Sequence, residues 1–120
     1  YTLASRQQLS NFAEALEGIG DADAALSQVR VGIQRDVQVT SCDWGRAQLR
    51  DAEQTVTQVY ASACSVAYNR RSDAEDWEAF SRLVLDASYE ATLWAAVLSA
   101  AQHQTEGSRR VFLTCLGGGV

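Results

Sequence analysis

The longest regular pattern in this sequence lies in its second half, where apolar residues recur at helical spacing. Steps of three and four positions connect Trp77, Phe80, Val84, Ala87, Ala91, Trp94, Leu98 and Ala101. This spacing is typical of an amphipathic helix with one continuous apolar stripe. The stretch Ser72-Asp73-Ala74-Glu75 matches a capping box, and Gly107 is suited to a C-terminal stop. We therefore predict a helix that begins after Ser72 and runs to about Gln104.

Apolar runs on both sides of this helix predict two strands. Residues 55–67 carry apolar side chains at odd and even positions alike, and residues 111–116 form a short apolar run that glycines follow. A strand with two apolar faces is typical of the middle of a sheet that helices cover on both sides. The order strand, helix, strand requires a right-handed crossover if the two strands are parallel.

The first half of the chain predicts two further elements and a polar connection. A helix is expected from Ser5 to Leu16, and a short helical turn over residues 21–28. Residues 29–40 alternate between apolar and polar side chains, which predicts a strand with one buried face. Residues 41–53 are polar, and we expect a connection there that contains at most a short helix.

These patterns together predict an α/β fold for residues 1–120, with a mixed or mostly parallel sheet sandwiched by helices. We expect a single domain or a fragment of one. The sequence contains no Pro and no Met and stops one residue after a glycine run, whereas average usage would give roughly six prolines. We therefore expect the domain to be incomplete.

The charge balance and the cysteines narrow the class of partner. The net charge of -5 and the pI of about 4.7 disfavour nucleic acids and anionic membranes, since both would be repelled. No apolar run is long enough to span a membrane, and the first residues lack a secretory signal core.

Cys42, Cys64 and Cys115 form no CxxC pair and no zinc-like spacing with His103. We expect free thiols in a reducing, cytoplasmic compartment, no bound metal and no cofactor; the oligomeric state is open.

The glycine run at the end of the chain is the first candidate site. Gly117, Gly118 and Gly119 follow the last predicted strand, and Val120 comes after them. Glycine backbone can approach a ligand closely, and loops of this kind bind diphosphates through backbone N–H groups. The alternative is an ordinary flexible turn. No Lys follows the glycines, so the run is not a Walker A loop.

Three other residues are candidates for contact with the same ligand. Tyr68 and Asn69 follow the first of the two flanking strands, at the sheet edge where the glycine run would lie if the strands are parallel. Glu90 lies beside the apolar stripe and could contact a ribose or act as a base. The alternatives are turn chemistry for Asn69 and an exposed position for Glu90. Cys115 is expected to be buried in the last strand.

From Thr55 onward, the order of elements resembles the macrodomain family of ADP-ribose-binding proteins. The resemblance lies in TVTQVYASACSVAYN, then ASYEATLWAAVLSAA, then SRRVFLTCLGGGV. It implies a three-layer α/β fold in which residues 117–120 correspond to the first four positions of the family's diphosphate-binding loop. The first half of the chain has no match to the family's adenine-contacting Asp or to its Asn-rich catalytic loop.

The sequence therefore predicts binding of ADP-ribose or a related nucleotide diphosphate through residues 117–120. ADP-ribosyl hydrolase activity is left open, because no residue of this chain matches the catalytic loop. One alternative is a non-catalytic interaction or scaffold domain without a small-molecule ligand. Another is an enzyme of a different α/β family that acts on a nucleotide or phosphorylated metabolite.

Overall fold

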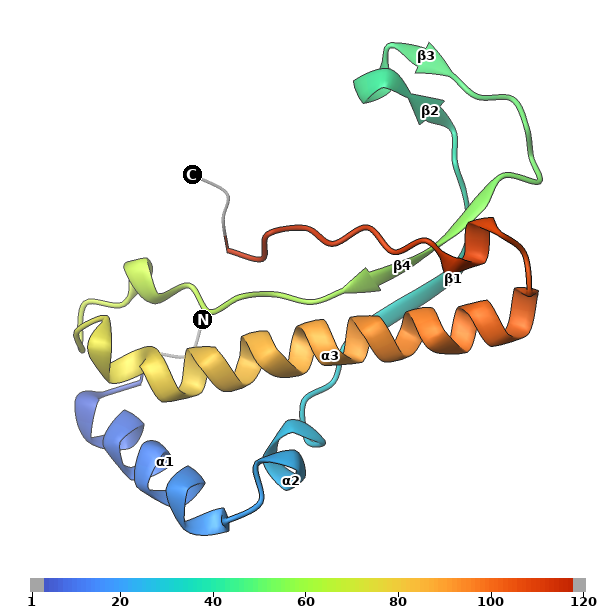
Figure 1. Ribbon diagram of the computed structural model, residues 1–120. Helices are drawn as coiled ribbons and strands as arrows, with labels where there is room; N and C mark the ends of the chain where they lie inside the picture. Colours follow the sequence, from blue (N-terminus) through green and yellow to red (C-terminus); the bar gives the residue numbers. More distant parts are fainter. Residues whose placement is uncertain (1–3, 118–120) are drawn as a thin grey trace.

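The structure is a computed structural model that describes residues 4–117 (Figure 1). Its α-helices are α1 (Arg6–Ile19), α2 (Ala22–Leu26) and α3 (Glu78–His103). Its strands are β1 (Gly32–Gln38), β2 (Ser41–Cys42), β3 (Ala47–Gln48) and β4 (Thr55–Tyr60). Short 3-10 turns lie at Asp43–Gly45, Val66–Tyr68, Glu75–Trp77 and Gly107–Arg109. In Figure 1, α1 and α2 lie along one side of α3, while β1, β4 and the C-terminal segment lie along the other.

Helix α1 begins where the sequence predicted, because Ser5 and Gln8 form a reciprocal capping box. The Ser5 Oγ accepts from the Gln8 amide at 3.3 Å, and the Gln8 Oε1 accepts from the Ser5 amide at 2.9 Å. The helix continues past the predicted end to Ile19 and stops at Gly20, which has a left-handed φ of 65°.

Helix α3 is confirmed, but both of its predicted terminal signals act differently. The Ser72 hydroxyl does not cap the helix; it accepts a hydrogen bond from the indole N–H of Trp77 at 2.8 Å. A 3-10 turn precedes the first α-helical residue, Glu78. At the other end, Gln104 adopts a left-handed conformation with φ of 51° and closes the helix before Gly107. The capping box at 72–75 and the stop at Gly107 were therefore wrong.

Strands β1 and β4 form a two-stranded antiparallel ribbon with a bulge. Ile33 pairs with Val59, whereas Val37 pairs with Val56, so the register shifts between these pairs. Asp36 lies within the shift and has a φ of 54°. Directly paired residues point to the same face of a ribbon, and Val59 and Val56, three positions apart on β4, point to opposite faces. The bulge therefore places Ile33 and Val37 on opposite faces. The single buried face predicted for residues 29–40 is therefore wrong.

The predicted fold class is contradicted. Within residues 4–117 the strands form only two antiparallel pairs, β1 with β4 and β2 with β3, and no parallel sheet lies between helix layers. Residues 111–115 run beside β4 in Figure 1 but form no strand. The segment after Tyr60 is irregular as well, and Cys115 is exposed rather than buried. The macrodomain-like three-layer arrangement is therefore wrong for this chain.

The core is small and lies where α1 crosses the start of α3. Phe12 contacts Phe80 edge to face with ring centroids 5.2 Å apart, and Phe80 contacts Trp77 at 6.0 Å. Among the described residues, the buried apolar side chains are Leu9, Trp77, Ala87 and Ala95. The radius of gyration is 18.0 Å, against about 14 Å for a compact domain of this length. The chain is therefore extended, with principal-axis extents of 53 × 32 × 16 Å.

Candidate functional site

The glycine run lies at the end of the described chain. Gly117 has a left-handed φ of 76°, and an added Cβ would come within 2.9 Å of the Ala63 Cβ. Glycine is therefore required at this position both by backbone conformation and by packing. Gly118, Gly119 and Val120 lie outside the described residues, so the predicted diphosphate loop stays a prediction.

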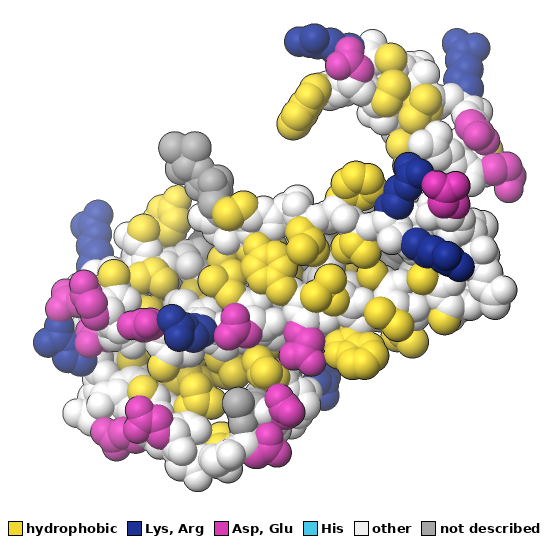
Figure 2. Space-filling view, viewed as in Figure 1, with side chains coloured by type: hydrophobic (Ala, Val, Ile, Leu, Met, Phe, Trp, Pro, Cys, Tyr) yellow, Lys and Arg dark blue, Asp and Glu magenta, His cyan; other side chains and the backbone are white. Residues whose placement is uncertain are grey.

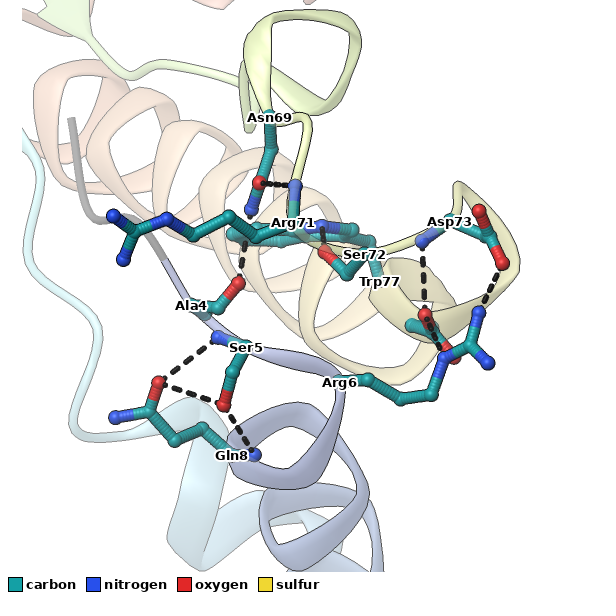
Figure 3. Close-up of polar contacts among 10 residues, drawn as sticks. Ala4, Ser5, Arg6, Gln8, Asn69, Arg71, Ser72, Asp73 and Trp77 are labelled. Atoms are coloured by element: carbon teal, nitrogen blue, oxygen red, sulfur yellow. Dashed lines mark hydrogen bonds and ion pairs between the residues drawn. The ribbon is translucent and has the colours of Figure 1, made fainter.

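The other three predicted ligand residues lie in different surroundings. Asn69 has a structural role: its Nδ2 donates to the Ala4 carbonyl at 3.1 Å, and its Oδ1 accepts from the Arg71 amide at 2.8 Å (Figure 3). Tyr68 is 79% exposed. The exposed Glu90 accepts from the indole N–H of Trp94 at 3.2 Å, within the same helix. None of the three lines the cleft described below.

A polar cluster fastens the start of α1 to the turn that precedes α3 (Figure 3). Arg6 donates to the carboxylates of Asp73 and Asp76, with 3.0 Å between Arg6 Nε and Asp76 Oδ2. The same Asp76 oxygen accepts from the Asp73 backbone amide at 2.9 Å. That backbone bond, followed by Arg6, holds the pKa of Asp76 below its usual value. The cluster holds the start of α1 against the turn that precedes α3.

A cleft of about 640 Å³ lies between α3, β4 and the C-terminal strap, which we define as residues 110–117. Acidic side chains of Asp36 and Glu53 line it together with basic groups of Arg110 and His103. Its other walls are apolar or hydroxyl-bearing. The cleft is present because the strap runs beside β4 without pairing with it.

The strap is fastened by one side chain of α3. The Tyr89 hydroxyl donates to the Thr114 carbonyl at 2.9 Å and accepts from the Leu116 amide at 3.0 Å. Phe112 lies in the strap two residues before Thr114, and its side chain is 88% exposed. The sequence predicted this segment as a buried strand, and no local signal distinguished a strand from an unpaired strap.

A second apolar surface lies on the C-terminal half of α3. We call it the α3 stripe: Leu93, Trp94, Val97 and Leu98, which are between 49% and 60% exposed. Figure 2 shows apolar side chains at the surface on both flanks of α3. The helical spacing placed Trp94 and Leu98 on the apolar side of α3, but both side chains are more than half exposed.

Groups suited to catalysis are scattered over the described part of the chain. His103 lies exposed at the end of α3, and Cys42 is exposed on the β2–β3 hairpin. Between residues 4 and 117, no three His, Cys, Asp or Glu side chains are grouped closely enough to hold a metal ion. No helix in that range is both long and apolar enough to cross a membrane.

No family model matches this sequence, and no curated protein or solved structure is significantly similar to it.

Proposed function

We propose that this chain is a non-catalytic interaction domain whose apolar core is completed by a protein partner. One observation carries the proposal. The chain exposes 9419 Å² and has a mass of 13.0 kDa, whereas a compact monomer of that mass exposes about 6,300 Å². The difference of about 3,100 Å² is larger than the area of about 1,000–2,500 Å² that one partner of an obligate complex typically buries.

The chemistry of the exposed surface supports a protein partner. The exposed large side chains include aromatic residues such as Trp94, Tyr60 and Phe112, together with aliphatic residues on α3 and the strap. Aromatic groups are enriched at the centres of protein interfaces. Contiguous apolar surface beyond a few hundred Å² is uncommon on monomers and marks sites of association.

Dye binding tests the proposal without knowledge of the partner. At low protein concentration, we expect strong anilinonaphthalene sulfonate fluorescence from a chain that keeps its helical circular dichroism and unfolds cooperatively. Leu98→Gln and Phe112→Ser should each lower that fluorescence without loss of helix, because both side chains are already exposed. Dye fluorescence no higher than that of a compact globular protein would contradict the proposal.

The second candidate function is binding of ADP-ribose or a related nucleotide. The observation in its favour is the cleft of about 640 Å³, within the range of about 300–1,000 Å³ typical of small-molecule sites. The acidic Asp36 and Glu53 in its wall would oppose a diphosphate. Calorimetric titration of ADP-ribose tests it: micromolar binding that Gly118→Val abolishes would support it, and absence of heat from the folded protein would refute it.

A further inference from the structure

Strand β4 is paired along only one of its two edges. The Val39 N–H donates to the Gln54 C=O at 2.9 Å, so Gln54 directs its carbonyl toward the β1 side. Along a strand, backbone groups alternate between the two edges. Thr55, Thr57 and Val59 therefore direct their N–H and C=O groups away from β1. In the described part of the chain no other strand or loop pairs with these groups, so this edge of β4 is open.

The open edge of β4 forms one wall of the cleft. The same three residues line it, together with the strap and α3. The α3 wall is built from small side chains at helical spacing: Thr92, Ala95, Ala96 and Ser99. An added strand lies about 4.8 Å from its neighbour. The cleft volume of about 640 Å³ accommodates a short extended segment at that spacing, with its side chains against the small residues of α3.

The strap does not occupy the open edge, because its backbone is held by α3. The Thr114 C=O and the Leu116 N–H are two residues apart, and one residue of a neighbouring parallel strand would bond such a pair of groups. The Tyr89 hydroxyl contacts both instead, at 2.9 Å and 3.0 Å. The edge of β4 is therefore left to the backbone of another chain.

The end of the cleft near the start of β4 carries unpaired negative charge. Glu53 comes just before β4, Asp36 lies in the β1 bulge, and both line the cleft. The basic side chains in the walls are His103 and Arg110, and Arg110 already pairs with Glu106 at 3.1 Å. Neither Asp36 nor Glu53 forms an ion pair with another described residue. A basic side chain of a ligand would complement this end.

We propose that an extended segment of a partner protein adds to the open edge of β4 as a strand within the cleft. It runs antiparallel to β4, which continues the β1–β4 pairing and is the slightly more stable arrangement. Its alternate apolar side chains face α3, and basic residues at its carboxyl end lie near Asp36 and Glu53. Strand addition of this kind takes affinity from main-chain hydrogen bonds. The proposal rests on the proposed function, since it names the form of the protein partner.

A synthetic peptide tests the proposal on the 120-residue chain. The probe is fluorescein-Thr-Val-Thr-Val-Thr-Lys-Lys-amide, followed by fluorescence anisotropy, and we expect a dissociation constant below about 100 µM. Only alternate N–H groups of an added strand face β4. Backbone N-methylation of either the two Val or the first two internal Thr and Lys positions of that alternation should therefore raise the constant at least about tenfold, and methylation of the other set should change it less than about threefold. Equal effects of the two methylated sets would overturn strand addition.

Thr57→Pro tests the same hydrogen bonds from the protein side. It removes an N–H from the open edge and leaves the bonds to β1 in place, a position at which strands tolerate Pro. The dissociation constant of the probe should rise at least about tenfold, whereas the matched control Thr57→Val, which keeps the N–H, should change it less than about threefold. Equal constants for the two variants would overturn the assignment to this edge. Should Thr57→Pro lose its circular dichroism, the methylated probes still decide the question.

The remaining outcomes separate the charge assignment and the proposed function from the strand itself. A probe that ends in Glu-Glu should bind at least about tenfold more weakly, and equal binding would refute the placement of basic residues near Asp36 and Glu53. A chain that binds the dye but not the Lys-Lys probe has an open surface without this edge site, and the strand addition is refuted. A chain that binds neither refutes both.

Discussion

Two tryptophans of the same amphipathic pattern should contribute very differently to the stability of the single chain. Trp77 is 7% exposed, donates to Ser72 and contacts Phe80. Trp94 lies further along the same face and is 60% exposed. Replacement of each by Ala therefore measures directly whether the C-terminal part of this apolar pattern, around Trp94, is covered within one chain.

The expected magnitudes follow from burial. Trp77→Ala should lower the free energy of unfolding by about 3–5 kcal/mol, because it removes a buried aromatic and leaves a cavity beside Phe80. Trp94→Ala removes a contact that involves less than half of the side chain, worth about 1 kcal/mol. The gain in helix propensity offsets up to about 0.5 kcal/mol of that loss. The net cost of Trp94→Ala should therefore be below about 1 kcal/mol.

Urea unfolding followed by far-ultraviolet circular dichroism measures both values, at a protein concentration low enough to keep the chain monomeric. Equal costs for the two variants at low concentration would show that Trp94 is buried within the single chain. That result would refute the open surface on this side of α3.

Two further predictions concern the ends of the chain. Tyr89→Phe should leave the free energy of unfolding within about 1.5 kcal/mol of wild type, but it should release the strap, because the Tyr89 hydroxyl bonds Thr114 and Leu116. Limited proteolysis between residues 110 and 117 should therefore become faster, and unchanged cleavage would contradict this role of the hydroxyl. The Asp73 amide, and after it Arg6, lower the folded-state pKa of Asp76. The ionised Asp76 therefore stabilises the fold above the ordinary carboxyl pKa of about 3.9, and this stabilisation is lost as the pH falls through the lowered pKa. Asp76→Asn should therefore flatten this part of the acid dependence in denaturation titrations, and an unchanged profile would contradict it.

Local signals in the sequence predicted the helices well. Ser5 and Gly20 act through hydrogen bonds and backbone conformation within a few residues, so their effect does not depend on distant parts of the chain. Helix α3 was likewise predictable from its spacing. Ser72 failed as a cap because its hydroxyl is used by the Trp77 indole, a competition that the capping-box pattern does not reveal.

Burial and strand pairing were less predictable, since both depend on partners elsewhere. The alternation in residues 29–40 predicts one buried face, but the bulge at Asp36 turns the residues on its two sides toward opposite faces. The apolar run before Gly117 was predicted as a buried strand, yet it forms no strand and pairs with none. The pattern of α3 predicts which residues share a face but not whether this chain has enough structure to cover it. Likewise, the candidate ligand residues Tyr68 and Asn69 were chosen for a parallel sheet that is absent from the described residues.

Small-angle X-ray scattering on the dilute chain tests most directly the claim that its core is incomplete. The structure predicts a radius of gyration near 18.0 Å for the monomer, well above the value of about 14 Å for a compact domain of this length. A dilute monomer near 14 Å would mean that the chain covers its own apolar surface. That result would contradict the proposed interaction domain.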